Sequence, residues 1–146
     1  MFRFPKTLAV TVLGVLPFAT LADTTALKAA LPALPEGYES EIEEETDDHV
    51  VEWVWLSNDE ETYYIVELNF EDNAVAGFKK TFKAMTFAMD TVDAGGQTFT
   101  FDGDMYMTLI NKSVLVRVFG TDPDAVKLGA IQSMDFAPLV GLADGG

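Results

Sequence analysis

Two neighbouring stretches of the chain, residues 50–56 and 62–70, alternate between two sets of side chains and are rich in β-branched and aromatic residues. An alternation with a period of two indicates β-strands, because successive side chains point to opposite faces of a sheet. A short polar turn separates the stretches, which favours antiparallel pairing. One face carries Val51, Trp53, Trp55, Tyr63 and Ile65, and the other carries Val50, Val54, Leu56, Tyr64, Val66, Leu68 and Phe70.

A helical stripe follows these strands. Between positions 75 and 89 apolar residues recur at spacings of three and four, as they do on one face of an α-helix. We expect Asp72 or Asn73 to cap the start of this helix and Gly95-Gly96 to close the segment. The stripe consists of Val75, Phe78, Phe82, Met85 and Met89, and Lys79, Lys80 and Lys83 lie away from it.

Shorter signals describe the segment before the first strand and the sheet edge. Residues 25–31 can form a short helix, which Pro32 and Pro35 end because proline cannot continue it. The acidic segment 39–46 is expected to be an edge strand, where charge discourages pairing with other chains. Asp47-Asp48 then turns the chain into the strand that follows.

The second half of the chain predicts three more strands, at residues 97–101, 104–110 and 113–119. Asp102-Gly103 favours a tight two-residue hairpin between the first two. A last helix should open at Asp122-Pro123, with Asp122 as its cap. The residues expected to bury that helix and dock the tail are Val126, Ala130, Ile131, Met134, Phe136, Leu139 and Val140.

Taken in order, these elements predict an α+β fold. We expect an antiparallel sheet of about six strands in the order α-βββ-α-βββ-α, with the helices packed mainly on one face. The two halves look alike at their joins, where a strand leads into an acidic helix start. Either an internal duplication or the general likeness of capped helices that follow strands can produce this similarity.

The N-terminus has the three parts of a secretory signal. Arg3 and Lys6 form a basic region, residues 8–18 are mostly apolar, and Thr20-Leu21-Ala22 places small residues where signal peptidase reads. The alternative is a membrane anchor, but a span needs about 20 apolar residues and this run is shorter. We therefore expect a cleaved signal at residues 1–22, a single domain at 23–146, no membrane span after cleavage, and a periplasmic or secreted protein.

Charge and cysteine content limit the partners and the chemistry. The chain has 24 acidic and nine basic residues and no cysteine. Removal of residues 1–22 leaves seven basic residues against 24 acidic ones, a net charge of −17. Such a charge disfavours nucleic acid and favours basic partners, or it serves solubility. The absence of cysteine removes thiol catalysis and thiolate metal sites, and the domain must fold by packing without disulfides.

Candidate catalytic groups are few in kind. His49 is the single histidine, and no serine lies in a nucleophile elbow, so we expect His49 to be an exposed residue at a strand start. Carboxylates are numerous enough that a glycosidase-like pair is possible, which leaves a small periplasmic hydrolase as an alternative. We favour a protein that is not an enzyme, since no acidic pair stands out from its surroundings.

Oxygen ligands make calcium the most plausible metal. The acidic groups are Glu43-Glu44-Glu45, Asp47-Asp48, Asp102 with Asp104, and Asp122 with Asp124. None has the ligand spacing of an EF-hand loop, and each also suits an edge strand, a turn or a helix cap. A calcium-responsive domain remains an alternative. No glycine-rich phosphate loop precedes a helix, so no nucleotide or other cofactor is expected.

The aromatic residues of the first strands are the best candidates for a binding site. Trp53, Trp55 and Tyr63 would share one sheet face with Ile65, and helices are expected on the opposite face. An open aromatic strip edged by acids would suit a basic ligand or another envelope protein. The alternative is a second core layer that covers these rings.

A broader resemblance supports the same reading. The segment Leu31-Pro32 to Pro35-Glu36-Gly37-Tyr38, the paired strands and the closing Met134-Asp135-Phe136 resemble small exported bacterial domains of unassigned function. The resemblance implies a compact periplasmic α+β domain and assigns no site. The resulting hypothesis is an exported acidic binding or interaction domain.

Overall fold

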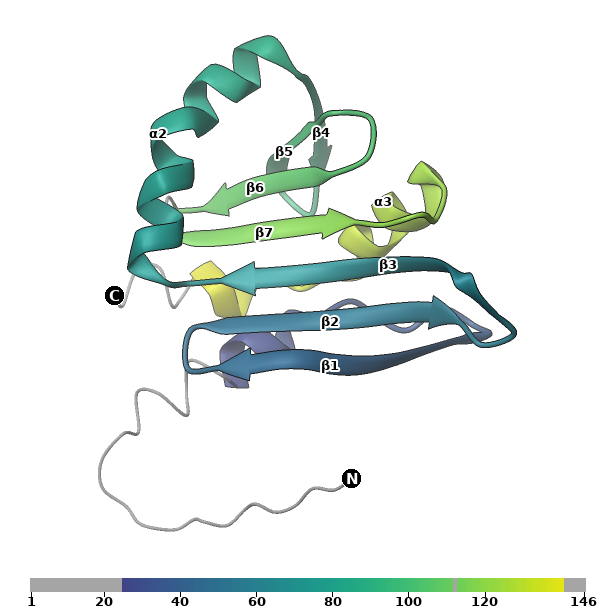
Figure 1. Cartoon of the computed structure of the whole chain (residues 1–146). Coiled ribbons are helices and arrows are strands. Elements are labelled where there is room, and N and C mark those ends of the chain that lie inside the picture. Colours follow the sequence, from purple (N-terminus) through teal and green to yellow (C-terminus); the bar gives the residue numbers. More distant parts are fainter. Residues whose placement is uncertain (1–24, 112, 141–146) are drawn as a thin grey trace, which may run out of the picture.

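The computed structural model describes residues 25–111 and 113–140, and the expected signal at residues 1–22 lies outside them. The fold is α+β, with one open, fully antiparallel sheet of seven strands (Figure 1). The strands and the longer helices are β1 (Tyr38–Thr46), β2 (His49–Leu56), β3 (Asp59–Asn69), α2 (Asp72–Ala88), β4 (Asp90–Ala94), β5 (Gln97–Phe101), β6 (Tyr106–Ile110), β7 (Val114–Phe119) and α3 (Asp124–Ser133). Residues 25–29 and 137–140 add two short helical turns.

The sheet joins two sequential groups of strands along one seam. Its order is β1-β2-β3-β7-β6-β5-β4, so β3 and β7 lie in the middle and β1 and β4 form the edges. At the seam Ile65 pairs with Phe119 and Glu67 pairs with Arg117. The expected acidic edge strand is confirmed, because β1 pairs with β2 alone in the described sheet and its side chains from residue 39 onward are exposed.

The back face of the sheet, which points away from the viewer in Figure 1, holds the main core. The turn at residues 25–29, α3 and the tail after it cover this face. Burial is complete at several positions on it, and each buried aliphatic side chain stabilises the fold by about 1.5–3 kcal/mol. The fully buried side chains include Leu27, Val50, Tyr64, Val66, Leu68, Phe99, Ile110, Ile131 and Leu139.

The expectation that helices pack mainly on one face is wrong for the longest helix. α2 crosses the front face, where Val75 packs with Leu109 and Leu115, and Phe78 and Phe82 pack against this small cluster (Figure 1). The stripe at positions 75–89 was read correctly, but a stripe indicates which side of a helix is buried and not which sheet face buries it.

The sheet has one strand more than expected. β4 follows α2 directly, and Gly95-Gly96 forms the two-residue turn between β4 and β5 instead of closing the helix. Both glycines have positive φ values, 61° and 81°, which two-residue hairpin turns favour. The predicted tight turn at Asp102-Gly103 is a longer loop, because β6 begins at Tyr106 and Asp102 Oδ1 accepts hydrogen bonds from the backbone N–H groups of Asp104 and Met105.

The predicted helix caps also differ. α2 begins after Glu71, whose side chain makes no capping bond, and α3 begins after Pro123. Asp122 is buried and accepts a hydrogen bond from the Tyr38 hydroxyl at 2.9 Å instead of capping α3. Its side chain therefore ties the start of β1 to the segment before α3, across the back of the sheet.

Candidate functional site

The front face of β1–β3 carries a strip of half-buried apolar side chains that we call the aromatic surface. Trp53 stacks on Tyr63 with ring centroids 4.9 Å apart, and Trp55 pairs across the strands with Tyr63. Ile65 continues the strip to Phe119 on β7. No helix lies in front of this half of the sheet in Figure 1. The aromatic surface consists of Val51, Trp53, Trp55, Tyr63, Ile65 and Phe119.

The edge strand adds a row of negative charge to this surface. Glu39 pairs with Trp55, Glu41 with Trp53, and Glu44 with Val51, so these three glutamates share the front face with the aromatic rings. All three are exposed. We call them the acidic rim. Exposed carboxylates attract the charged ends of lysine and arginine, and the apolar rings beside them can pack against the stems of the same side chains.

A charged cluster closes the end of the surface near the start of β2. His49 Nδ1 lies 2.9 Å from Glu44 Oε2, and His49 Nε2 lies 2.7 Å from Glu67 Oε2. Arg117 Nε donates to Glu67 Oε1 at 2.6 Å. Glu67 is almost fully buried, and its carboxylate lies between the histidine ring and the arginine guanidinium, which carries the opposite charge.

His49 begins β2, as expected, but the expectation that it is exposed is wrong. Its side chain is 14% exposed, and carboxylates occupy both ring nitrogens. Each ring nitrogen therefore contacts a carboxylate oxygen, one on β1 and one on β3. In this arrangement the ring has no free nitrogen to accept a proton from a nucleophile, and it links β1, β2 and β3 electrostatically.

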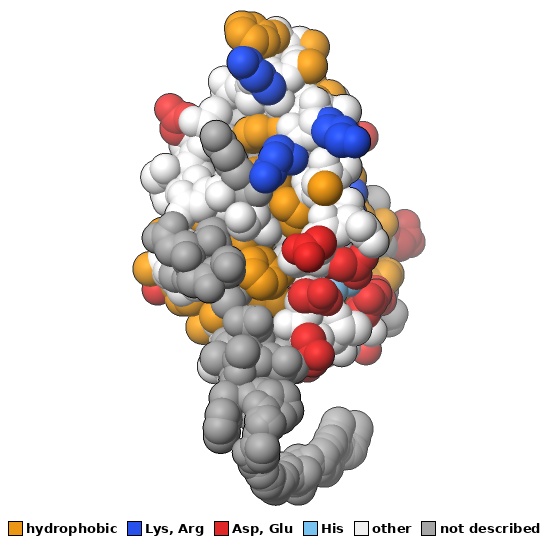
Figure 2. Space-filling model, turned by 90° about the vertical axis from the view of Figure 1, so that its left-hand side faces the viewer, with side chains coloured by type: hydrophobic (Ala, Val, Ile, Leu, Met, Phe, Trp, Pro, Cys, Tyr) orange, Lys and Arg blue, Asp and Glu red, His pale blue; other side chains and the backbone are white. Residues whose placement is uncertain are grey.

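Positive charge on the front face gathers on α2. Figure 2, which views the molecule from the left-hand side of Figure 1, shows basic side chains over the upper part of the molecule and a group of acidic side chains around the histidine below them. Lys79, Lys80 and Lys83 are exposed, and no carboxylate in the described residues lies within ion-pair distance of them. Phe87, near the end of the same helix, is 85% exposed. The front face therefore has a basic half and an acidic half.

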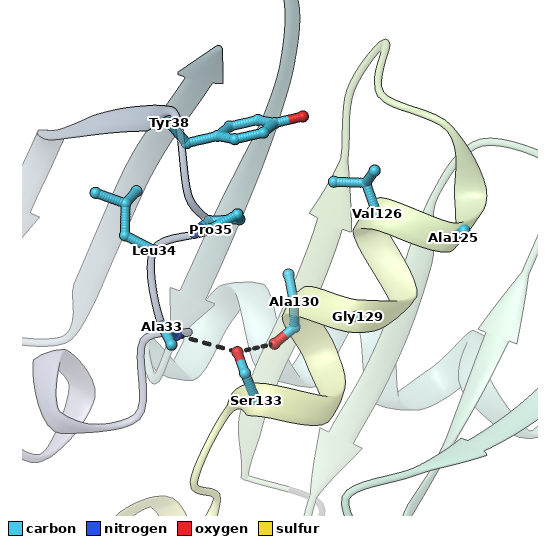
Figure 3. Close-up of a pocket in the computed structure, with 9 residues that line it drawn as sticks. All are labelled: Ala33, Leu34, Pro35, Tyr38, Ala125, Val126, Gly129, Ala130 and Ser133. Atoms are coloured by element: carbon cyan, nitrogen blue, oxygen red, sulfur yellow. Dashed lines mark hydrogen bonds between the residues drawn. The ribbon is translucent and has the colours of Figure 1, made fainter. Parts of the chain in front are cut away.

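The back layer contains a pocket of about 390 Å³ between the segment that precedes β1 and α3 (Figure 3). Tyr38, Leu34 and Val126 line it from opposite sides. Ala33 N–H donates to Ser133 Oγ at 3.0 Å, which holds the two walls together at one end. The lining is mostly apolar, and an open pocket of this kind suits a small apolar group.

A group of buried polar side chains lies next to the ring of Tyr38. Glu52 Oε1, Tyr64 OH and Asp122 Oδ2 are buried without a hydrogen-bond partner among the described residues. Burial raises the pKa of Glu52, although a hydrogen bond with Ser40 acts in the opposite direction. Burial also raises the pKa of Asp122, against the effects of the Tyr38 hydrogen bond and of Lys127.

The two tyrosines respond to the same surroundings. Burial and the hydrogen bond to Asp122 raise the pKa of Tyr38 to about 12. Burial, with the nearby charges of Glu52 and Asp122, raises the pKa of Tyr64 as well. All four groups are therefore held toward their protonated forms, in which they can share hydrogen bonds at lower cost than buried charges.

The acidic clusters considered for calcium serve other contacts in the structure. Glu44 contacts His49, Glu45 forms an ion pair with Lys28 at 2.9 Å, and Asp102 holds the loop before β6. Lys127 is buried, donates to the Gly120 carbonyl at 3.1 Å and lies 3.8 Å from Asp124. Within residues 25–111 and 113–140 no three His, Cys, Asp or Glu side chains are grouped so that they could hold a metal.

Sequence reasoning placed Trp53, Trp55 and Tyr63 together, and the structure brings them to one partly exposed face. It missed Glu67 and Arg117, which are 50 residues apart and meet through the pairing of β3 with β7. Opposite charges on two predicted strands, each on the face that alternates with the core face, were the available signal. Without the strand order that signal could not be interpreted.

Comparison of the chain with protein-family models, with curated protein sequences and with solved structures finds no match. Among the helices that the structure describes, none is long and apolar enough to cross a membrane. The assignment of a function therefore depends on the geometry of the front face.

Proposed function

We propose that this chain is an exported acidic binding domain that holds a basic, partly apolar segment of another protein on the aromatic surface. The observation that carries the proposal is the stacked pair Trp53–Tyr63 beside the acidic rim, on the half of the front face without a helix. Aromatic side chains with adjacent charge are typical of interface centres, where a few residues dominate the binding energy. The export signal in the sequence is the second support.

The chemistry of the surface defines the segment that it would bind. Apolar side chains would pack on the rings, and lysine or arginine would reach Glu39, Glu41 and Glu44 at the edge. A segment with both features on one side is an amphipathic helix or an extended basic strand. Because the rim is exposed, its charges would raise the association rate and make binding sensitive to salt.

The chain provides its own reporter for the test. Its two tryptophans both belong to the aromatic surface, so tryptophan fluorescence would respond directly to a ligand there. We would titrate the protein with a synthetic amphipathic helical peptide of lysine and leucine, at low and high salt. The expected result is a saturable change in fluorescence that weakens at least about tenfold between low salt and about 0.5 M salt.

Two variants distinguish binding at the aromatic surface from non-specific binding elsewhere on the protein. Tyr63→Ala should reduce the affinity at least about tenfold, as truncation of an interface centre does. The matched control is Leu34→Ala, since Leu34 is an exposed apolar residue in the other layer of the molecule. Equal binding by the wild type and by Tyr63→Ala, or a signal that salt leaves unchanged, would contradict the proposal. Export is tested separately, by locating the processed chain in cell fractions.

A further inference from the structure

We infer that the front face is self-complementary, and that the segment held on the aromatic surface is α2 of a second copy of this chain. The inference rests on the proposed function, because it names the partner of the same surface. Its starting point is the charge division of the front face. In a chain with 24 acidic residues, three of the nine basic residues lie on one helix, and that helix has no acidic residue after Asp72.

The outward side of α2 matches the features that the aromatic surface requires. With about 100° between successive residues, Ala76, Lys83 and Phe87 fall close together on the side of the helix away from the stripe that faces its own sheet, and Lys79 lies at the margin of that side, next to Val75. All four are exposed. This side therefore offers lysines for the acidic rim and an apolar ring for the aromatic surface or its edge. Phe87 is 85% exposed, so most of its ring surface is open to a partner.

A two-fold axis can satisfy both contacts at once. α2 lies in front of β6 and β7, on one half of the sheet, and runs roughly across the strands (Figure 1). The aromatic surface lies on β1–β3, on the other half. An axis parallel to the strands, in front of the seam between β3 and β7, exchanges the two halves. Each α2 then lies over β1–β3 of the other copy, and the contact occurs twice.

The dimensions agree with this arrangement. Lys79 to Phe87 spans about 12 Å along a helix axis, at 1.5 Å per residue. Three adjacent strands at a spacing of about 4.8 Å are about 10 Å wide between the outer two. The two helices would form one layer shared between two sheets. Closed two-fold dimers of this isologous kind are the commonest homo-oligomers.

The charges in Figure 2 show the same relation. The lysines lie above and the acidic cluster lies below on the same side of the molecule. Half a turn about an axis along the line of sight brings one group onto the other. If the two copies instead met with like halves of their front faces together, the acidic rim of each copy would lie against the acidic rim of the other, which costs free energy.

The test is a charge exchange measured by sedimentation equilibrium with the processed protein. The wild type should form a dimer whose dissociation constant rises at least about tenfold between low salt and about 0.5 M salt. Lys79→Glu/Lys83→Glu should be a monomer at concentrations where the wild type is dimeric, and so should Glu39→Lys/Glu41→Lys. An equimolar mixture of the two variants should restore the dimer, because each helix then meets a rim of opposite charge.

The control is Lys28→Glu, which reverses one exposed lysine in the helical turn that covers the back face and should leave the dimer unchanged. Circular dichroism of each variant would show that it is folded. A wild-type monomer at all concentrations, a mass that grows beyond the dimer, or a variant mixture that stays monomeric would overturn the inference. If the wild type is a monomer but still binds the lysine–leucine peptide, the proposed function stands and the inference falls. If it does neither, both fall.

Discussion

On the back of the sheet Leu27, Ile131 and Leu139 have no exposed surface, whereas on the front α2 buries one of its own residues, Val75. The back layer is therefore built as a core, and the front layer is a helix that rests on one half of the sheet. The difference teaches where stability and binding reside. Residues behind the sheet should dominate the free energy of unfolding, and residues in front should change association with little effect on folding.

The largest expected effect is a cavity in the back layer. Ile131→Ala should lower the free energy of unfolding by about 2–5 kcal/mol, since a fully buried aliphatic side chain leaves a space that the fold cannot close. Urea unfolding followed by circular dichroism would measure the change. A loss below about 1 kcal/mol would show that the back layer is not a tightly packed core.

The next effect lies at the charged cluster between the two halves. Arg117→Met should cost about 1.5–3 kcal/mol, because Glu67 would lose its charge-assisted hydrogen bond while it stays buried. Arg117→Lys is the matched control, since it keeps the positive charge and should cost less. Urea unfolding of both variants gives the comparison, and equal costs would show that the guanidinium geometry has no role.

A front-layer truncation should be milder than the back-layer one. Phe82→Ala should lower the free energy of unfolding by about 1–2 kcal/mol, below the usual range for buried phenylalanine, because its ring is partly exposed and packs at the margin of a small cluster. The same urea experiment compares it directly with Ile131→Ala. If Phe82→Ala is the more destabilising of the two, the division between the layers is wrong.

The smallest of these effects is a gain, and it depends on pH. Burial raises the pKa of Glu52 in the folded chain above its ordinary value of 4.5. The stability linked to the protonated form is therefore fully present below that ordinary value, and it is lost as the pH rises through the raised value. Glu52→Gln removes this loss. It should raise stability at pH 8 by about 1 kcal/mol and leave stability at pH 4 nearly unchanged.

Melting temperatures from pH 4 to pH 8 would check this last prediction. The wild type should lose more stability over that range than Glu52→Gln. Glu41→Gln is the control, since Glu41 faces solvent at the rim on the other side of the sheet and should change the pH dependence little. Parallel curves for the wild type and Glu52→Gln would mean that Glu52 is not held toward its protonated form.

Local pattern was enough to predict the faces of β2 and β3, because the alternation of Trp53, Val54 and Trp55 depends on neighbours in the sequence. β4 was missed because Asp90–Ala94 is five residues long, carries few apolar residues and directly follows a helix. The side of the sheet that α2 covers could not be predicted, since it depends on where the chain goes after the helix. The pairing of residues on different strands, such as Glu67 with Arg117, also depends on the course of the chain after α2.

The candidate surface shows the same division. The shared face of Trp53, Trp55 and Tyr63 was predicted because these residues alternate along adjacent strands. The exposed acidic rim was predicted from its run of glutamates. That His49 lies between two carboxylates was not predicted. Its contact with Glu67 requires the β2–β3 register, and its contact with Glu44 follows a register shift in β1 between Ile42 and Glu44.

The seam between β3 and β7 has a consequence for how the chain acquires its structure. Every other strand pairing joins strands that are neighbours in sequence. The pairing of β3 with β7, in which Ile65 lies opposite Phe119, can form only after the chain has passed through α2 and three more strands. Until then β3 presents an unpaired edge, the kind of edge that captures strands of other molecules. In a chain that crosses a membrane from its N-terminus, β3 would emerge well before β7, and its edge would stay unpaired until β7 emerged. Sequences that slow the arrival of β7 should therefore lower the yield of folded protein more than they lower its final stability.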